Sequence, residues 1–257
     1  MPTDFIFYAA AVPAVILVGL SKGGLGGAFA LMGVPILALV ISPVQAAAIL
    51  LPIMIVMDIF SLWIWRHYND ATTLKVMLPG AMIGIGIGWL TASLVSTELI
   101  RLLVGLIAIW FVGLYVYERY KARRGKEPPP RPQQPVKGTF WATISGFTSF
   151  VTHAGGPPFQ IYTLPLRLDP KVYVGTSTRY FAIVNAVKLI PYFALGQFDA
   201  SNLSASFVLM PLAPLATLAG AWIVKRLRPE VFYPLMYLTI LATSVKLVAD
   251  GMNALLH

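Results

Sequence analysis

The sequence contains no cysteine and few charged residues. The absence of cysteine excludes disulfide bonds and thiolate metal sites. Charged residues make up only 11% of the chain, whereas soluble domains average about 25%. Because 58% of the residues are hydrophobic and one membrane-spanning helix needs about 20 apolar residues, the chain has enough for roughly eight to ten membrane segments. We therefore predict an all-α integral membrane protein without an aqueous domain.

A cleavable signal peptide is also not expected, because the first four residues carry no basic charge and the apolar run after them leads into more membrane sequence. Ten hydrophobic segments are predicted. The first, second, sixth and seventh are short and are interpreted as half-helices or re-entrant hairpins. The predicted segments lie near residues 4–20, 25–41, 43–65, 73–95, 98–118, 138–152, 156–167, 170–195, 204–225 and 229–251.

The net charge of +9 does not indicate a nucleic-acid partner, because the basic residues lie mainly in the short loops between apolar segments. Lysine and arginine gather in cytoplasmic loops of membrane proteins. Fifteen of the 19 fall on one side when crossings are counted outward from residues 121–137. This count predicts a cytoplasmic linker and two external termini, in a cell (inner) membrane. Proline density in the linker favours an extended tether between a first repeat, 1–120, and a second repeat, 138–257.

The two predicted repeats align with each other. Ser42-Pro43 matches Asp169-Pro170 at an offset of 127 residues, and the same offset pairs Asp58 with Asn185. Each repeat has an odd number of crossings, so the second copy would be inverted relative to the first, as in many secondary transporters. Duplication for symmetric packing alone is the alternative. Each copy also has a glycine-rich break within membrane sequence, at residues 21–27 and 152–158. Irregular backbone at membrane depth needs protein or a polar cavity around it.

The duplicated block resembles the TauE/SafE sulfite exporter family of membrane proteins. The resemblance rests on the glycine-rich turn, the proline after it, and the next helix starting with Ser-Pro or Asp-Pro, and it covers roughly residues 14–120 and 138–252. The run Gly175-Thr176-Ser177-Thr178 and the paired repeat ends Gly88…Glu98 and Gly220…Glu230 are similar to the family's motifs.

This resemblance implies secondary-active transport of small sulfur-containing anions, with sulfite, sulfonates such as sulfoacetate, and thiosulfate as candidates. An ion gradient of H⁺ or Na⁺, and not ATP, would supply the energy, and no cofactor or metal is expected. The alternatives are a channel, a non-transporting scaffold or assembly factor, and an intramembrane enzyme. An enzyme is disfavoured because no HExxH motif or equivalent constellation is present.

Ionisable residues inside membrane segments are candidate functional groups. Arg179 and Lys188 are candidate anion-binding residues; alternatively, Arg179 binds carbonyl groups at a helix break or pairs with Asp58, and Lys188 extends to the outer interface. Lys22 is placed at the cytoplasmic side or the cavity floor. Asp58 is expected either to relay protons or to pair with Arg179 or Lys22. His153 is the other candidate proton relay, or a satisfied hydrogen-bonding group.

The glycines of the two breaks would let an anion approach unpaired N–H groups at a helix start. The alternative is that these glycines only permit close helix packing. A glycine stripe at Gly80, Gly84, Gly86 and Gly88 predicts close helix contact and could serve a homodimer in the lipid bilayer. The candidate substrate-binding residues besides Arg179, Lys188 and Lys22 are Gly26, Gly27, Gly155, Gly156, Asn185, Thr176, Ser177 and Gln160.

Overall fold

The computed structural model describes residues 5–25, 27–91, 96–122, 130–152, 154–194 and 200–256. All regular elements in these ranges are helical, which confirms the all-α fold. The helices are α1 (Phe5–Leu20), η1 (Ser21–Leu25), α2 (Gly27–Leu37), α3 (Pro43–Ile64), α4 (Ala71–Thr91), α5 (Thr97–Ala122), α6 (Pro135–Thr152), α7 (Gly156–Thr163), η2 (Leu164–Leu166), α8 (Pro170–Ala194), α9 (Ala200–Leu209), α10 (Leu212–Val224) and α11 (Pro229–Leu256).

Proline marks the first residue of four of these helices, α3, α6, α8 and α11. Its fixed φ suits the first helical position, where its missing N–H group costs nothing. The ninth predicted segment is two helices, α9 and α10, and not one straight helix. It bends by 49° between α9 and α10, where Pro211 cannot donate the N–H that a continuous helix requires.

Four helices of the described ranges are long and apolar enough to cross a membrane. They are Phe5–Leu25, Ala71–Thr91, Glu98–Tyr117 and Pro229–Ala254, and the bent α9–α10 pair makes a fifth if it counts as one span. Large apolar side chains such as Leu90, Trp110 and Phe193 are exposed, as expected for surfaces that face lipid and not water. The chain is therefore an integral membrane protein.

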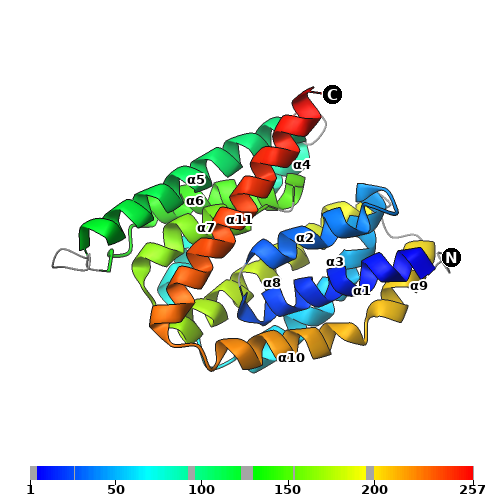
Figure 1. Ribbon diagram of the computed structural model, residues 1–257, viewed down its shortest axis with the longest axis horizontal. Helices are drawn as coiled ribbons and strands as arrows, with labels where there is room; N and C mark the ends of the chain where they lie inside the picture. Colours follow the sequence, from blue (N-terminus) through cyan, green and yellow to red (C-terminus); the bar gives the residue numbers. More distant parts are fainter. Residues whose placement is uncertain are drawn as a thin grey trace. The chain divides into compact units, whose positions relative to one another are not determined.

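The helices form two compact units. Unit 1 comprises Met1–Asp70 and Pro170–Arg228, and unit 2 comprises Ala71–Asp169 and Pro229–His257. Each unit combines segments from both predicted repeats. Within unit 1, α1 packs against α10 and α2, and α3 packs against α8. Within unit 2, α4 packs along α6, and α5 lies side by side with α11 (Figure 1).

The glycines of α4 explain its packing in unit 2. A methyl group at Gly80 or Gly84 would overlap the backbone of α6, and one at Gly88 would lie 3.1 Å from the ring of Phe150. These three glycines therefore bring two helix backbones together, as the stripe predicts. Gly86 has no neighbour within 4 Å at its Cβ position. The homodimer stays a prediction, but Gly80, Gly84 and Gly88 already contact α6 within the chain.

The end of the proline-rich linker is held against unit 2. The hydroxyl of Tyr162 donates to Gln133 Oε1 at 2.7 Å and accepts from the Gln134 N–H at 3.2 Å. Gln133 Nε2 also donates to Thr73 Oγ1 at 2.7 Å. The linker was predicted to span 121–137, whereas α5 continues to Ala122 and α6 starts at Pro135. These hydrogen bonds fix Gln133 and Gln134, directly before α6.

Candidate functional site

The first glycine-rich break forms a short π-helical turn, η1, directly after α1. Gly24 has a φ of 126°, a left-handed conformation that glycine adopts readily and other residues adopt only with strain. A Cβ at Gly23 would overlap the carbonyl of Thr217 and lie 2.6 Å from Ala221 N on α10. Both glycines are therefore needed here, Gly24 for its backbone conformation and Gly23 for close packing.

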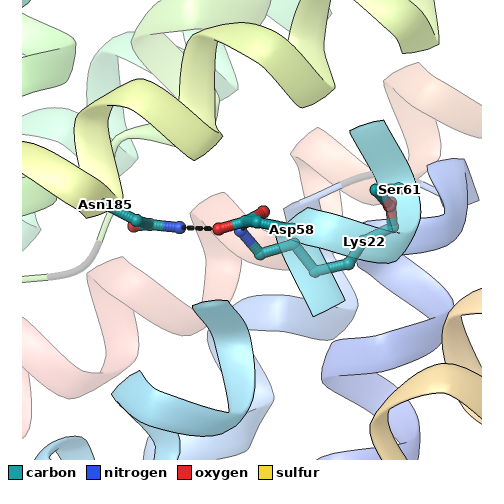
Figure 2. A network of polar contacts seen from close by, with 4 residues as sticks. All are labelled: Lys22, Asp58, Ser61 and Asn185. Atoms are coloured by element: carbon teal, nitrogen blue, oxygen red, sulfur yellow. Dashed lines mark hydrogen bonds and ion pairs between the residues drawn. The ribbon is translucent and has the colours of Figure 1, made fainter. Parts of the chain in front are cut away.

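Asp58 and Ser61 on α3, and Trp65 directly after it, hold this break in place and lie at i, i+3 and i+7. The Lys22 ammonium pairs with Asp58 Oδ1 at 2.5 Å. The Ser61 hydroxyl donates to the Lys22 carbonyl (Figure 2), and Trp65 Nε1 donates to the Gly23 carbonyl at 3.2 Å. The carbonyl groups that the break frees thus receive side-chain donors, which is the condition for irregular backbone at membrane depth.

The same carboxylate also binds α8. Asn185 Nδ2 donates to Asp58 Oδ2 at 2.8 Å (Figure 2), so each oxygen of Asp58 accepts one hydrogen bond. Lys188, one turn further along α8, is 2% exposed and interacts electrostatically with Lys22 and Asp58. Two lysines and one carboxylate therefore gather around the break of unit 1, where their charges are shielded little by water. We call Lys22, Asp58, Asn185 and Lys188 the charged network.

Arg179 lies on α8 but is engaged elsewhere. Its guanidinium donates to the carbonyls of Trp65 at 3.1 Å, Arg66 at 2.6 Å, Tyr68 at 2.8 Å and Gly175 at 3.0 Å. The first three follow the C-terminal end of α3, where helix carbonyls lack intrahelical partners. This arrangement corresponds to the alternative in which Arg179 binds free carbonyls. Its role toward an anion stays a prediction.

Thr176 and Ser177 lie beside Arg179 on α8. The Thr176 hydroxyl accepts the Asp70 N–H at 2.8 Å and donates to the Val172 carbonyl at 2.7 Å. Ser177 is half-buried. Thr176 therefore helps to fix the loop after α3, together with Arg179.

The second break lies in unit 2 and is held by hydroxyl groups. Ser145 Oγ donates to the Gly155 carbonyl at 2.7 Å, and Thr148 Oγ1 lies 3.2 Å from the Ala154 carbonyl. The Ala154 N–H donates to the Thr148 carbonyl at 3.1 Å. All three contacts come from α6, the helix that precedes the break. No charged side chain takes part among the described residues of this break.

The start of α7 offers few N–H groups to an anion. Pro157 and Pro158 have none, and the Phe159 N–H donates to the Gly155 carbonyl at 3.3 Å. Gly155 and Gly156, directly before these prolines, do have N–H groups. Gln160 is buried in α7, with 4% of its surface exposed. Anion binding by Gly155, Gly156 and Gln160 stays a prediction.

Two candidate residues, Gly26 and His153, lie outside the described residues. Gly27 is the first residue of α2. Trp65, Ser145 and Thr148 were not predicted to hold the breaks. Their spacing in the sequence could have indicated this role. Asp58, Ser61 and Trp65 recur at i, i+3 and i+7, and so do Ser145, Thr148 and Thr152. Each set therefore shares one helix face.

The structure thus has two glycine-rich breaks between helices, with a charged network beside the first of them. The family model of sulfite exporter TauE/SafE matches residues 11–247, nearly the whole chain. The chain belongs to the TauE/SafE family. This is a family of membrane transporters. The predicted class of protein, a transporter, agrees with the family. No curated protein and no solved structure matches the chain.

Proposed function

We propose that this TauE/SafE protein is a secondary-active transporter of a small sulfur-containing anion, and that the charged network binds the anion. The observation that carries the proposal is the cluster of buried Lys188, buried Asp58 and partly buried Lys22 at a helix break in unit 1. Buried charge in a membrane segment is costly. Binding of an anion would explain why such charges are present, because the anion interacts strongly with the lysines in a site that excludes most water.

Lys22 and Lys188 would supply the attraction, whereas Asp58 would balance Lys22 while no anion is bound. Of the pair, the Lys22 side chain is 13% exposed and the Asp58 side chain 5% exposed. A lysine presents three rotatable donors, and this suits the several oxygens of a sulfite or sulfonate group. α2 begins directly after the break, at Gly27, so the first-turn N–H groups of this helix lie next to Lys22 in the chain. The positive end of the helix dipole would add to the attraction.

Alternating access would follow from the inverted repeat, with H⁺ or Na⁺ as the coupling ion. The sulfite, sulfonate or thiosulfate class is taken from the family and has no separate support in the charged network. The basic linker and loops support a cytoplasmic linker with both termini outside, in the cell (inner) membrane. Arg179, with its four carbonyl contacts, is given the role of holding the loop after α3.

The test is exchange of labelled sulfite, sulfoacetate and thiosulfate across proteoliposomes that contain only this protein. Wild type should exchange at least one of them with saturable kinetics, and Lys188→Met should lower the rate about 10-fold or more, because one charge-assisted hydrogen bond contributes about 1.5–3 kcal/mol. The matched control is Lys246→Met, since Lys246 pairs with Asp250 one turn away on α11 at 2.8 Å. No exchange of any of these anions by wild type, or equal loss in both variants, would contradict the proposal.

A further inference from the structure

Asp58 and Asn185 occupy equivalent positions in the two halves of the chain. α3 begins at Pro43 and α8 begins at Pro170, and each of the two side chains belongs to the fifteenth residue after its proline. They also contact each other, because Asn185 Nδ2 donates to Asp58 Oδ2 at 2.8 Å across a separation of 127 residues in the chain. Two residues that a two-fold rotation exchanges meet only at the rotation axis. This hydrogen bond therefore lies where the predicted pseudo-two-fold axis passes between α3 and α8.

The two residues of this pair differ chemically, although their positions are equivalent. Two carboxylates at this distance could not both be ionised, whereas an amide is neutral in either case. The amide of asparagine has both donors and an acceptor. By turning about its side-chain bond, Asn185 can donate to an ionised Asp58 or accept from a protonated one. Of the two equivalent residues, only Asp58 can accept a proton. Asn185 can form a hydrogen bond with Asp58 in both the ionised and the protonated form.

Lys22 on η1 and Lys188 on α8 are cations close to Asp58. The ammonium of Lys225, directly after α10, lies 5.5 Å from the ring centroid of Trp65 at the end of α3. The remaining helices of unit 1, α1, α2, α9 and α10, contain no Asp, Glu, Lys, Arg or His within their described bounds. Asp58 is also the one acidic residue in the described helices of this unit.

We propose that Asp58 is the proton-coupling group among the described helices of unit 1, placed on the predicted pseudo-two-fold axis, and that protonation of Asp58 releases Lys22 to the anion. This inference rests on the proposed function. When a proton binds one carboxylate oxygen, an O–H bond forms and the negative charge that holds Lys22 is lost. The Lys22 ammonium then attracts the anion. Loss of the proton to the other side of the membrane restores the ion pair and expels the anion, so one proton accompanies each anion.

Two assays on the same proteoliposomes test the coupling. Anion exchange at equal pH reports binding and movement of the anion, whereas accumulation driven by a pH gradient also requires coupling. We expect Asp58→Asn to abolish gradient-driven accumulation and to remove the dependence of exchange on pH, because the amide cannot be protonated, whereas exchange by wild type should rise as the pH falls. Gradient-driven accumulation by Asp58→Asn, or exchange that keeps the pH dependence of wild type, would overturn the proposal. Loss of all exchange in a folded variant would also overturn it, because the neutral amide should leave Lys22 available to the anion.

The exchanged pair Asp58→Asn with Asn185→Asp tests the axis. This double variant moves the carboxylate across the axis to the equivalent position, and we expect it to recover a measurable part of the accumulation that Asp58→Asn loses. A folded double variant that accumulates no more than Asp58→Asn would contradict the axial placement.

The reversal potential of wild type needs no variant, and it should give one proton per anion. Zero or two protons would overturn the proposal. Absence of exchange in wild type would instead overturn the proposed function, whereas exchange without gradient-driven accumulation would overturn only the proton coupling.

Discussion

The two breaks in the chain occupy similar places in the sequence but are held by different chemistry. In unit 1, an ion pair to Asp58, a serine on α3 and the tryptophan directly after α3 hold the break between α1 and α2. In unit 2, Ser145 and Thr148 on the preceding helix hold the break between α6 and α7. Both arrangements satisfy backbone carbonyl groups, so both meet the requirement that a membrane imposes. Among the described residues, only the first break also has charged side chains around it.

If the two halves are repeats, as the sequence predicts, this difference gives their two breaks different roles. A break held by hydroxyl groups needs no counter-ion and can keep one geometry throughout a transport cycle. A break held by an ion pair changes whenever one of the charges is neutralised or meets a ligand. The variants below separate these two cases, beginning with the largest expected effect.

Removing one partner of the ion pair should have the largest effect. Lys22→Met leaves Asp58 buried without its ammonium, and breaking a buried pair in this way costs about 3–5 kcal/mol. The matched control is Lys22→Met with Asp58→Asn, which removes both charges and should restore at least about 2 kcal/mol. Thermal unfolding in detergent measures both. Equal losses in the single and double variants would show that the pair does not stabilise the break.

A methyl group at the first break should be the next most costly change. At Gly23 it would meet the backbone of α10, which cannot move aside, so we expect Gly23→Ala to cost about 2–3 kcal/mol. At Gly155 it would lie 2.7 Å from Ser149 Cβ and 2.8 Å from the Ser145 carbonyl, and the cost should be about 1–2 kcal/mol.

Gly113→Ala is the control for both glycine variants, because nothing lies within 4 Å of that Cβ position on α5. It should be neutral or stabilising by up to about 1 kcal/mol, the difference in helix propensity. Thermal unfolding of the three variants measures their losses of stability and ranks them. A cost at Gly113 as large as that at Gly23 would mean that close packing is not the cause.

Replacing Arg179 by lysine should have an intermediate effect. Lysine keeps the charge but lacks the planar fork that reaches several carbonyls at once, so we expect a loss of about 1–2 kcal/mol. The loop between α3 and α4 should also become more accessible. Because the chain has no cysteine, a single cysteine in place of His67 reports this by its rate of labelling. Unchanged labelling together with weaker anion binding would instead favour Arg179 as an anion ligand.

The hydroxyl groups of the second break should contribute least individually. Ser145→Ala removes one hydrogen bond to the Gly155 carbonyl and should cost about 1 kcal/mol. Thermal unfolding measures the cost, and Ser145→Thr, which retains a hydroxyl, is the control. A loss as large as that of Lys22→Met would remove the distinction between the two breaks.

Much of the fold could be predicted from hydropathy, proline and glycine, because these act locally along the chain. The predicted start of the third and eighth segments at Pro43 and Pro170 is confirmed, since proline favours the first helical position. The bend at Pro211 was missed because the apolar run continues across it.

The contacts within the site were harder to predict, because they depend on distances between helices. The sequence left Asp58 with two possible partners, and the choice of Lys22 required the geometry of η1. Arg179 had three possible roles, and its carbonyl contacts became visible only when α8 was placed against the end of α3. Ser145 and Thr148 resemble ordinary helix residues until the break folds back onto them.

The most direct test of the central claim is the affinity of the purified protein for sulfite, measured by thermal shift in two double variants. Lys22→Gln with Asp58→Asn neutralises the first break, and Ser145→Ala with Thr148→Val removes the hydroxyl groups of the second. The account predicts at least about a 10-fold weaker affinity in the first and a change of about threefold or less in the second. Equal losses in the two variants, or loss only in the second, would contradict the assignment of the anion to the charged network.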